Sequence, residues 1–374
     1  MDSLILFIAV LFLSFSNGSN DNFKGVATLF GSATTDYRKA INWATATTFL
    51  GSVASILLAS TLVENFSGKG LVPDEFVLLP DFAISIALGA ALTVYIATKI
   101  GMPVSTTHSL VGALTGAALI AVGMSFNVAK LAGTFLIPLI VSPLIAAVLS
   151  LVTYLVFRKT RIQIGVTKET CICIGDEYIP VAENVEGSGI IKFNRSSGHP
   201  KISVGNNNDC VEVYQGKLFG ISAQRILDTA HFLSSGVVSF ARGLNDTPKI
   251  VGLLLIVNIL DIEWGMLAVG VAIAVGGLLK AKKVGVTVSK EITPMNPGQG
   301  FTANLITGIL VTTASLHGLP VSTTHVSVGS IFGIGNATKQ ANIKTVSRIL
   351  LSWVLTLPLA AFISALVFFL LSRI

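Results

Sequence analysis

The sequence predicts an all-α polytopic membrane protein made of two inverted-topology repeats with broken helices and re-entrant hairpins, plus a small polar β-rich cytoplasmic insert. Three observations predict this class. Of the 374 residues, 52% are hydrophobic and only 12% are charged, and the mean hydropathy is +0.78. The apolar stretches form two sets of six, separated by one long polar region. A polar hexapeptide occurs once in each set, letter for letter.

The low content of charged residues excludes a water-soluble globular protein, which carries about twice this share. The net charge is +6 at pH 7, but the Lys and Arg residues lie in loops between apolar runs. That distribution indicates membrane topology and not a surface for nucleic acid. The predicted surroundings of the chain are therefore a lipid bilayer.

The apolar stretches set the predicted domain boundaries. They cover 3–16, 23–35, 41–63, 82–100, 103–123 and 127–157, then 219–241, 247–260, 264–279, 301–316, 319–335 and 345–371. We predict a first transmembrane repeat over 1–157, a cytoplasmic insert over 158–217 and a second, inverted repeat over 218–374. The β-prone runs of the insert are 161–166, 190–193, 201–204 and 210–214.

Polar motifs repeat inside the apolar sets and indicate a duplicated unit. The pair Asn20-Asp21 is echoed by Asn245-Asp246, and each pair is predicted to interrupt a membrane helix. The hexapeptide Pro-Val-Ser-Thr-Thr-His occupies 103–108 and again 320–325. A matched glycine frame follows each hexapeptide, with Gly112 and Gly116 in the first copy and Gly329 and Gly333 in the second.

Basic residues distinguish the equivalent loops of the two halves. The loop after the second stretch contains Arg38 and Lys39, whereas its counterpart contains Asp261 and Glu263. In the next pair of loops the lysines are concentrated in the second half, over 280–291. Because Lys and Arg mark cytoplasmic loops, the halves are predicted to have opposite topology, with both termini extracytoplasmic. Inverted repeats with discontinuous helices recur in membrane transporters.

The repeated hexapeptide is the candidate anion site. Gly101 and Gly318 precede the two copies and allow a turn, and Pro103 and Pro320 suit the first position of a new helix. Two helix starts that face each other offer N–H groups, positive dipole ends and hydroxyls to a small tetrahedral oxyanion. Capping and packing of membrane helices is the alternative role for these hydroxyls. The candidate ligands are Ser105, Thr106, Thr107, Ser322, Thr323 and Thr324.

Asp21 and Asp246 are candidates for cation and substrate binding. A carboxylate inside a bilayer costs about 3 kcal/mol or more, so its presence indicates function. Either carboxylate could accept a hydrogen bond from a protonated phosphate oxygen. Structural ion pairs with Lys24 and Lys249, three positions further on, are the alternative. The candidate sodium ligands, which offer the oxygen atoms that hard cations prefer, are Asn20, Asp21, Asn245 and Asp246.

His108 and His325 close the two hexapeptides. Proton handling is one role open to them, and an interhelical hydrogen bond that fixes the hairpin is the other. Together with Lys24 and Lys249 they are predicted to be coupling or structural residues.

These motifs resemble the inorganic phosphate transporter (PiT) family. The likeness rests on the Gly-x-Asn-Asp motifs at 18–21 and 243–246, the doubled hexapeptide, and the stretch 279–300 with Ile292-Thr293-Pro294. It implies symport of phosphate with sodium or protons by a homodimer. It also implies that both Ser-Thr-Thr triplets line the substrate and cation sites, which adds Ser105 and Ser322 to the sodium ligands.

The chain departs from the family pattern at one position. Several relatives carry a glutamate just before the segment 49–52, where this chain has Thr47 and Thr48. A coupling role of that acid cannot be transferred to this chain. Some relatives carry sulfate, so the resemblance leaves the anion open.

The sequence therefore favours a secondary active transporter of the cell membrane that imports phosphate in symport with a cation, with sodium favoured. A proton-coupled sulfate or phosphate permease is the alternative. No catalytic residue and no cofactor are predicted, apart from sodium as the coupling ion. A membrane phosphatase would need a nucleophile with its base, which the sequence does not offer. An anion channel would differ in showing flux that ignores cation gradients.

Overall fold

The computed structural model describes residues 2–163, 168–169, 172–175, 178–181, 192–195, 201–204, 213–214, 217–218, 221–255 and 261–373. The chain divides into two compact units, one formed by 1–160 with 226–374 and the other by 161–225. The first unit is helical and contains all the candidate site residues.

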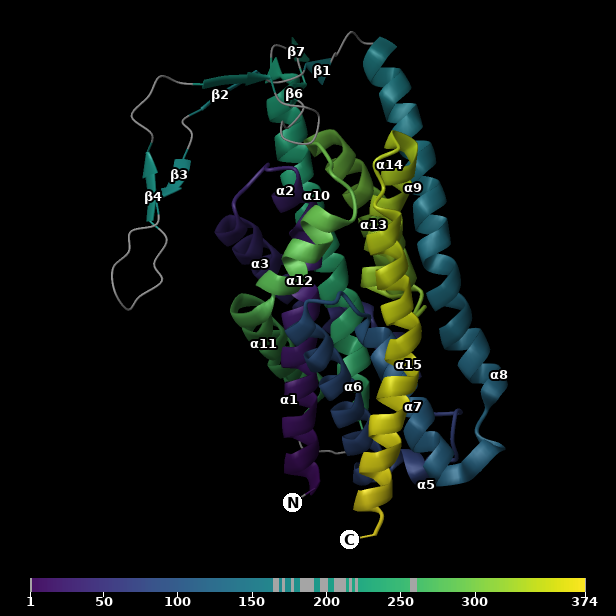
Figure 1. The fold of residues 1–374 in the computed structure, drawn as a ribbon. Coiled ribbons are helices and arrows are strands. Elements are labelled where there is room, and N and C mark those ends of the chain that lie inside the picture. Colours follow the sequence, from purple (N-terminus) through teal and green to yellow (C-terminus); the bar gives the residue numbers. More distant parts are fainter. Residues whose placement is uncertain are drawn as a thin grey trace. The chain divides into compact units, whose positions relative to one another are not determined.

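The first half of the helical unit begins with α1 (Asp2–Asp21), the 3₁₀ turn η1 (Asn22–Val26) and α2 (Ala27–Gly31) (Figure 1). It continues through α3 (Tyr37–Leu58), α4 (Ser60–Phe66), α5 (Asp74–Val77), α6 (Pro80–Ile100), α7 (Thr106–Val122) and the 3₁₀ turn η2 (Gly123–Ser125). It ends with α8 (Val128–Lys130), the π-helical turn η3 (Leu131–Leu136) and α9 (Ile137–Gln163).

The second half begins with α10 (Ala223–Val251), the 3₁₀ turn η4 (Gly252–Leu254), α11 (Ile262–Lys280), α12 (Lys282–Val286) and the π-helical turn η5 (Thr287–Glu291). It ends with α13 (Pro297–Leu316), α14 (Thr323–Thr338) and α15 (Ile343–Leu371).

Six helical segments in the described part of the chain are long and apolar enough to cross a membrane. They are Asp2–Gly31, Tyr37–Leu58, Pro80–Ile100, Val128–Gln163, Ile262–Lys280 and Ile343–Leu371. Their exposed side chains include Leu144 and Val148 on α9 and Val354 and Phe362 on α15, which a bilayer would cover. The protein is therefore a polytopic membrane protein, as its composition predicts.

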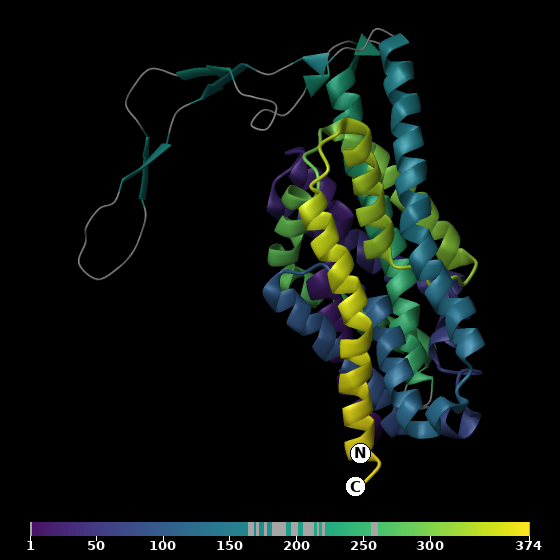
Figure 2. The same ribbon diagram turned by 45° about the vertical axis from the view of Figure 1, so that its right-hand side comes forward.

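The two helices that carry the Asn-Asp pairs, α1 and α10, run in opposite directions (Figure 1). In Figures 1 and 2, α1 rises from the end of the bundle at which both termini lie, and α10 descends toward that end. The pair α6 and α7 occupies the lower half of Figure 1, and the pair α13 and α14 occupies the upper half. Each pair is a helical hairpin, and its turn contains a glycine in the left-handed region, Gly101 (φ +80°) or Gly318 (φ +68°).

The tips of the two hairpins touch. The hydroxyl of Thr324 donates to the carbonyl oxygen of Val104 at 3.1 Å, and the hydroxyl of Thr107 donates to the carbonyl oxygen of Val321 at 3.4 Å. The two hexapeptides therefore form one cluster, although equivalent residues in 103–108 and 320–325 are 217 positions apart in the sequence. The helices after the turns begin at Thr106 and Thr323 and not, as the sequence suggested, at the prolines.

The two predicted helix interruptions differ in outcome. In the first half α1 ends at Asp21 and the 3₁₀ turn η1 follows, so the chain departs from α-helix at the predicted pair. In the second half the prediction is wrong, because α10 continues through Asn245 and Asp246 to Val251. Pro248 lies inside α10, and a membrane helix tolerates proline where neighbouring helices or Ser and Thr side chains can satisfy the freed backbone groups.

The glycines that follow each hexapeptide lie where a helix of one half packs against a helix of the other half. On α7, a Cβ at Gly112 would collide with the carbonyl oxygen of Leu357 on α15. On α14, a Cβ at Gly329 would collide with the carbonyl oxygen of Pro143 on α9. The return helix of each hairpin thus packs tightly on the last helix of the other half. Small residues permit such close approach of helices in membranes.

The second unit contains short antiparallel strand pairs. They are β1 (Lys168–Glu169) with β6 (Val213–Tyr214), β2 (Ile172–Gly175) with β5 (Lys201–Val204), β3 (Tyr178–Val181) with β4 (Lys192–Arg195), and β7 (Lys217–Leu218) with β8 (Ile221–Ser222). The described strands pair only in twos and form no larger sheet. The run predicted at 201–204 is a strand, whereas residues 161–163 of the run predicted at 161–166 belong to α9, and 164–166 lie outside the described residues.

Candidate functional site

A buried polar centre lies where the two hairpin tips meet α1, η1 and α10. Every side chain that the sequence singled out for substrate, sodium or coupling is at most 6% exposed. The set is Asn20, Asp21, Lys24, Ser105, Thr106, Thr107, His108, Asn245, Asp246, Lys249, Ser322, Thr323, Thr324 and His325. An ion can therefore reach this centre only after a conformational change.

Two helix N-termini point into the centre. Ser105 is the N-cap of α7, and its hydroxyl oxygen accepts from the backbone N–H of His108 at 3.1 Å. Ser322 is the N-cap of α14 and accepts from the backbone N–H of His325 at 3.2 Å. Capping uses an acceptor lone pair of each serine and leaves its hydroxyl hydrogen to donate. Both helix starts carry partial positive charge toward the centre.

The ammonium group of Lys24 lies in a cage of oxygen atoms. It pairs with a carboxylate oxygen of Asp21 and donates to the amide oxygen of Asn20 at 2.8 Å. It also donates to the carbonyl oxygen of Val104 at 2.7 Å and to the hydroxyl of Thr324 at 2.8 Å. The ion pair that the sequence left as an alternative is therefore present, and it is joined to both hairpins.

The ammonium group of Lys249 lies in a second cage with the same plan. It donates to the hydroxyl of Thr107 at 2.8 Å and to the carbonyl oxygen of Val321 at 2.6 Å, and it lies 3.5 Å from a carboxylate oxygen of Asp246. The ammonium of Lys249 has one oxygen partner fewer than that of Lys24, because the amide oxygen of Asn245 accepts from Ser315 and not from the lysine. Each lysine thus contacts a backbone carbonyl of one hairpin and a hydroxyl of the other.

Asn17 joins the two aspartates. Its amide nitrogen lies 3.1 Å from a carboxylate oxygen of Asp21 and 3.4 Å from one of Asp246. The same nitrogen donates to Thr106 at 2.9 Å, and the Thr106 hydroxyl donates to Asp21 at 3.0 Å. Carboxylates that are more than 200 positions apart in the sequence therefore share one donor.

Arg242 belongs to the centre and was missed in the sequence. It lies four residues before Asp246, as Asn17 lies four residues before Asp21. Its side chain is 1% exposed and interacts electrostatically with both aspartates. Both terminal nitrogens, Nη1 and Nη2, lack a hydrogen-bond partner among the described residues. Comparing the motif flanks of the two halves, which places this arginine opposite Asn17, would have revealed it.

The buried charges of the centre leave an excess of positive charge. Among the residues that the structure describes, the buried Lys, Arg, Asp and Glu side chains are Lys24, Arg242, Lys249, Asp21 and Asp246. Three cationic groups face two carboxylates, so the formal charge is +1. Because an uncompensated buried charge is costly, the centre favours an anion.

The two histidines lie against each other. The ring centroids of His108 and His325 are 4.3 Å apart, and His325 stacks on Trp353 with centroids 3.7 Å apart. Nδ1 of His325 lies 3.1 Å from the carbonyl oxygen of Leu139 on α9, so this histidine makes the interhelical hydrogen bond that the sequence offered as one role. Nδ1 of His108 has no partner among the described residues.

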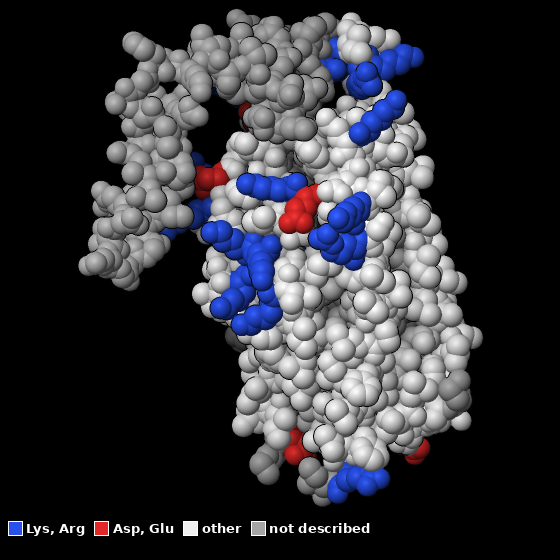
Figure 3. All heavy atoms as spheres, in the orientation of Figure 1, with Lys and Arg blue, Asp and Glu red and all other residues white. Residues whose placement is uncertain are grey.

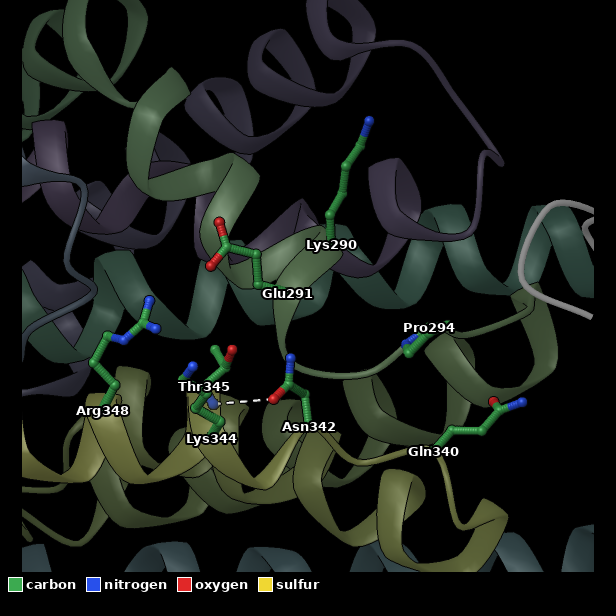
Figure 4. Close-up of a pocket in the computed structure, with 8 residues that line it drawn as sticks. All are labelled: Lys290, Glu291, Pro294, Gln340, Asn342, Lys344, Thr345 and Arg348. Atoms are coloured by element: carbon green, nitrogen blue, oxygen red, sulfur yellow. Dashed lines mark hydrogen bonds between the residues drawn. The ribbon is translucent and has the colours of Figure 1, made fainter.

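A separate pocket of about 510 Å³ opens at the surface (Figure 4). It is lined by Lys290, Glu291, Pro294, Gln340, Asn342, Lys344, Thr345 and Arg348. These residues precede α13, follow α14 or begin α15, so the pocket lies at the outer end of the second hairpin. Lys and Arg side chains gather on the upper part of the face shown in Figure 3. The pocket contains none of the predicted site residues.

Comparison with known proteins identifies the chain. It matches the phosphate transporter family over residues 17–364. The chain belongs to the phosphate transporter family. The resemblance found in its motifs is thereby confirmed.

Several relatives match over nearly their full length. A protein of Haemophilus influenzae to which a phosphate permease activity is attributed is 28% identical, with 97% of this chain and 95% of that protein covered. A protein of Rhizobium meliloti described as a low-affinity inorganic phosphate transporter is also 28% identical, with coverage of 98% and 96%. A solved structure of a protein named as the sodium-dependent phosphate transporter is 25% identical and superposes with a TM-score of 0.76, covering 100% of this chain and 99% of that one.

Thr48, at the position where the resemblance implies a glutamate in several relatives, lies against α10. A Cβ at Gly243 would collide with the carbonyl oxygen of Thr48, so Thr48 abuts the helix that carries Asp246. The Thr48 hydroxyl is buried and has no partner among the described residues. Thr48 thus offers a hydroxyl and no carboxylate beside α10, the helix that also carries Arg242.

Proposed function

We propose that the chain transports inorganic phosphate across the membrane in symport with a cation. The observation that carries this proposal is the buried centre with an excess positive charge, bounded by two helix N-termini. Membership of the phosphate transporter family, whose relatives bear phosphate-transport names, supports phosphate as the anion.

Arg242 is the side chain that we expect to bind the anion most strongly. A guanidinium group offers two parallel N–H donors to a phosphate, and Nη1 and Nη2 of Arg242 have no other partner among the described residues. Thr106 and Thr323 begin the two helices and would donate from opposite sides. Asp21 and Asp246 would accept from a protonated phosphate oxygen, which selects phosphate over fully ionised sulfate. The remaining proposed phosphate ligands are Ser105, Thr107, Ser322 and Thr324.

The oxygen-bearing side chains of the centre are the proposed ligands of the coupled cation. The sequence favoured sodium, with Asn20, Asp21, Ser105, Asn245, Asp246 and Ser322 as ligands. The protein whose structure superposes on this chain is named as sodium-dependent. In this chain the oxygen atoms of Asn20, Asp21 and Asp246 already face lysine ammonium groups. The identity of the cation therefore depends on what these oxygen cages hold during transport.

We further propose that the halves are inverted repeats that rock against each other. The support is the opposite course of α1 and α10 and the crossed pattern in which each lysine bridges both hairpins. When the halves move apart on one side, the hairpin tips separate there and open the centre to that side. Transporters with inverted repeats and sites at the repeat interface follow this scheme.

The location and assembly of the chain complete the proposal. We place it in the cell membrane, with both termini extracytoplasmic and the segment 158–217 cytoplasmic, because the basic loops mark the cytoplasmic side. A homodimer is proposed on the family resemblance alone. The relatives are transporters, so we propose no enzymatic activity.

Uptake into proteoliposomes tests the function. The purified protein is reconstituted, and uptake of [³²P]phosphate is measured with an imposed sodium gradient, an imposed proton gradient or neither, with sulfate as competitor. We expect saturable accumulation that one cation gradient drives and that sulfate inhibits weakly. Flux that ignores every cation gradient would indicate a channel, and competition by sulfate at equal concentration would indicate a sulfate permease.

A further inference from the structure

The oxygen cages around Lys24 and Lys249 have the chemistry of cation sites. The Lys24 cage combines a carboxylate, an amide oxygen, a backbone carbonyl and a hydroxyl, and the Lys249 cage combines a carboxylate, a carbonyl and a hydroxyl. Hard cations bind to such mixed oxygen sets. Both ammonium groups are buried, so the oxygen atoms are not shared with bulk water.

An ammonium group and a sodium ion exclude each other from one cage. The Lys24 ammonium lies 2.7–2.8 Å from the oxygen atoms of Asn20, Val104 and Thr324, which leaves no space for an ion between them. A lysine ammonium is a compact point charge, and its repulsion of a second cation is strong in a low-dielectric interior. The residues present therefore do not fit sodium as long as the lysine lies in the cage.

The lysines also make the contacts that a free coupling ion would have to make. Lys24 links the Val104 carbonyl of the first hairpin to the Thr324 hydroxyl of the second, and Lys249 links the Val321 carbonyl to the Thr107 hydroxyl. Each ammonium thus neutralises an adjacent aspartate and orders both hairpin tips. These are the two tasks that cation binding performs in an ion-driven symport.

We propose that Lys24 and Lys249 are covalently attached cations that take the place of sodium in these two cages, so that phosphate binding at the centre requires no sodium there. The proposal rests on the proposed function, because it concerns how the phosphate site is neutralised and ordered. A coupling ion must then be a proton or must bind outside these two cages. A lysine that contacts a carboxylate, a backbone carbonyl and a hydroxyl occurs in both halves, which argues against one accidental contact.

Equilibrium binding of ²²Na⁺ to the purified full-length protein tests the proposal. The variants are Lys24→Asn and Lys249→Asn, which remove the ammonium, supply an amide oxygen and leave an unpaired carboxylate that needs a cation. The matched control is Lys339→Asn, which changes an exposed lysine in a left-handed conformation that asparagine tolerates. We expect no saturable sodium binding in the wild type or the control, and one saturable site in each cage variant.

Phosphate binding in sodium chloride and in choline chloride supplies the second readout. We expect the wild-type affinity for [³²P]phosphate to be the same in both salts, and that of Lys24→Asn to fall about tenfold or more when choline replaces sodium, because the two ligands then assist each other. The sodium site of Lys24→Asn should disappear when Asp21→Asn is added.

Two results would overturn the proposal. One is a saturable sodium site in the wild type that Asp21→Asn or Asp246→Asn abolishes, and this result is decisive even if a cage variant fails to fold. The other is a folded Lys24→Asn protein that gains no sodium site. A wild type that binds no phosphate, combined with cage variants that gain sodium sites, would count against the proposed function and in favour of the attached cations.

Discussion

Replacing Arg242 with methionine separates phosphate binding from protein stability. The guanidinium is 1% exposed, and its Nη1 and Nη2 atoms have no partner among the described residues, so in the absence of phosphate it is a costly buried cation. Methionine is unbranched and fills irregular space. Each aspartate keeps its own lysine in this variant. We therefore expect Arg242→Met to weaken phosphate binding without loss of the fold.

The magnitude follows from the contacts that the variant loses. A hydrogen bond to a charged group contributes about 1.5–3 kcal/mol net, and a bidentate guanidinium makes two. The lost binding free energy is then about 3 kcal/mol or more, which is about 100-fold in affinity. An unsatisfied buried donor costs about 1–3 kcal/mol, and its removal offsets the lost attraction to Asp21 and Asp246. The unfolding temperature without phosphate should therefore stay the same or rise.

The assay combines [³²P]phosphate binding with thermal unfolding in one detergent. We expect phosphate to raise the unfolding temperature of the wild type and to have little effect on Arg242→Met, since only a bound ligand stabilises. Arg242→Lys keeps the positive charge but lacks the two parallel N–H donors of the guanidinium, so its affinity for phosphate should be intermediate. Arg38→Met, at an exposed position, is the control. Wild-type phosphate affinity in a folded Arg242→Met protein would refute the reasoning.

Three further predictions concern the aspartate, the helix starts and the glycine frame. Asp21→Asn should abolish phosphate accumulation and destabilise the protein by about 3–5 kcal/mol, because the buried Lys24 loses its carboxylate partner. Normal phosphate uptake in proteoliposomes would remove this carboxylate from the mechanism. Thr106→Val and Thr323→Val should each weaken phosphate affinity. Only Thr106→Val should also lower the unfolding temperature, because the Thr106 hydroxyl donates a hydrogen bond to Asp21 at 3.0 Å. Equal effects of both variants on the unfolding temperature would contradict this assignment. Gly112→Ala should cost about 1–3 kcal/mol through collision with a backbone carbonyl, whereas Gly133→Ala meets no atom within 4 Å and should leave thermal unfolding unchanged.

The predictions that succeeded depend on short-range features of the chain. Apolar stretches such as 82–100 and 345–371 agree with the bounds of α6 and α15 to within two residues at each end. They do so because a membrane-spanning helix needs an unbroken run of apolar residues, which is visible in the sequence. Gly101 and Gly318 take up positive φ, as their place before the hexapeptides predicted. The chemistry of the candidate site was equally visible, since a carboxylate or a run of hydroxyls within an apolar segment is conspicuous.

The sequence by itself determined the membrane class, the two copies of the polar motif, the two hairpin turns and the polar residue types that the centre would contain. Only the tertiary structure decided that α10 continues through Asp246, that Arg242 lies beside both aspartates, and that each lysine ammonium fills a cage completed by the opposite hairpin. The physical reason is one of range. Backbone preferences and lipid burial act on neighbouring residues, whereas the partners of Lys24 include a hydroxyl 300 positions away, whose approach depends on how all the intervening helices pack.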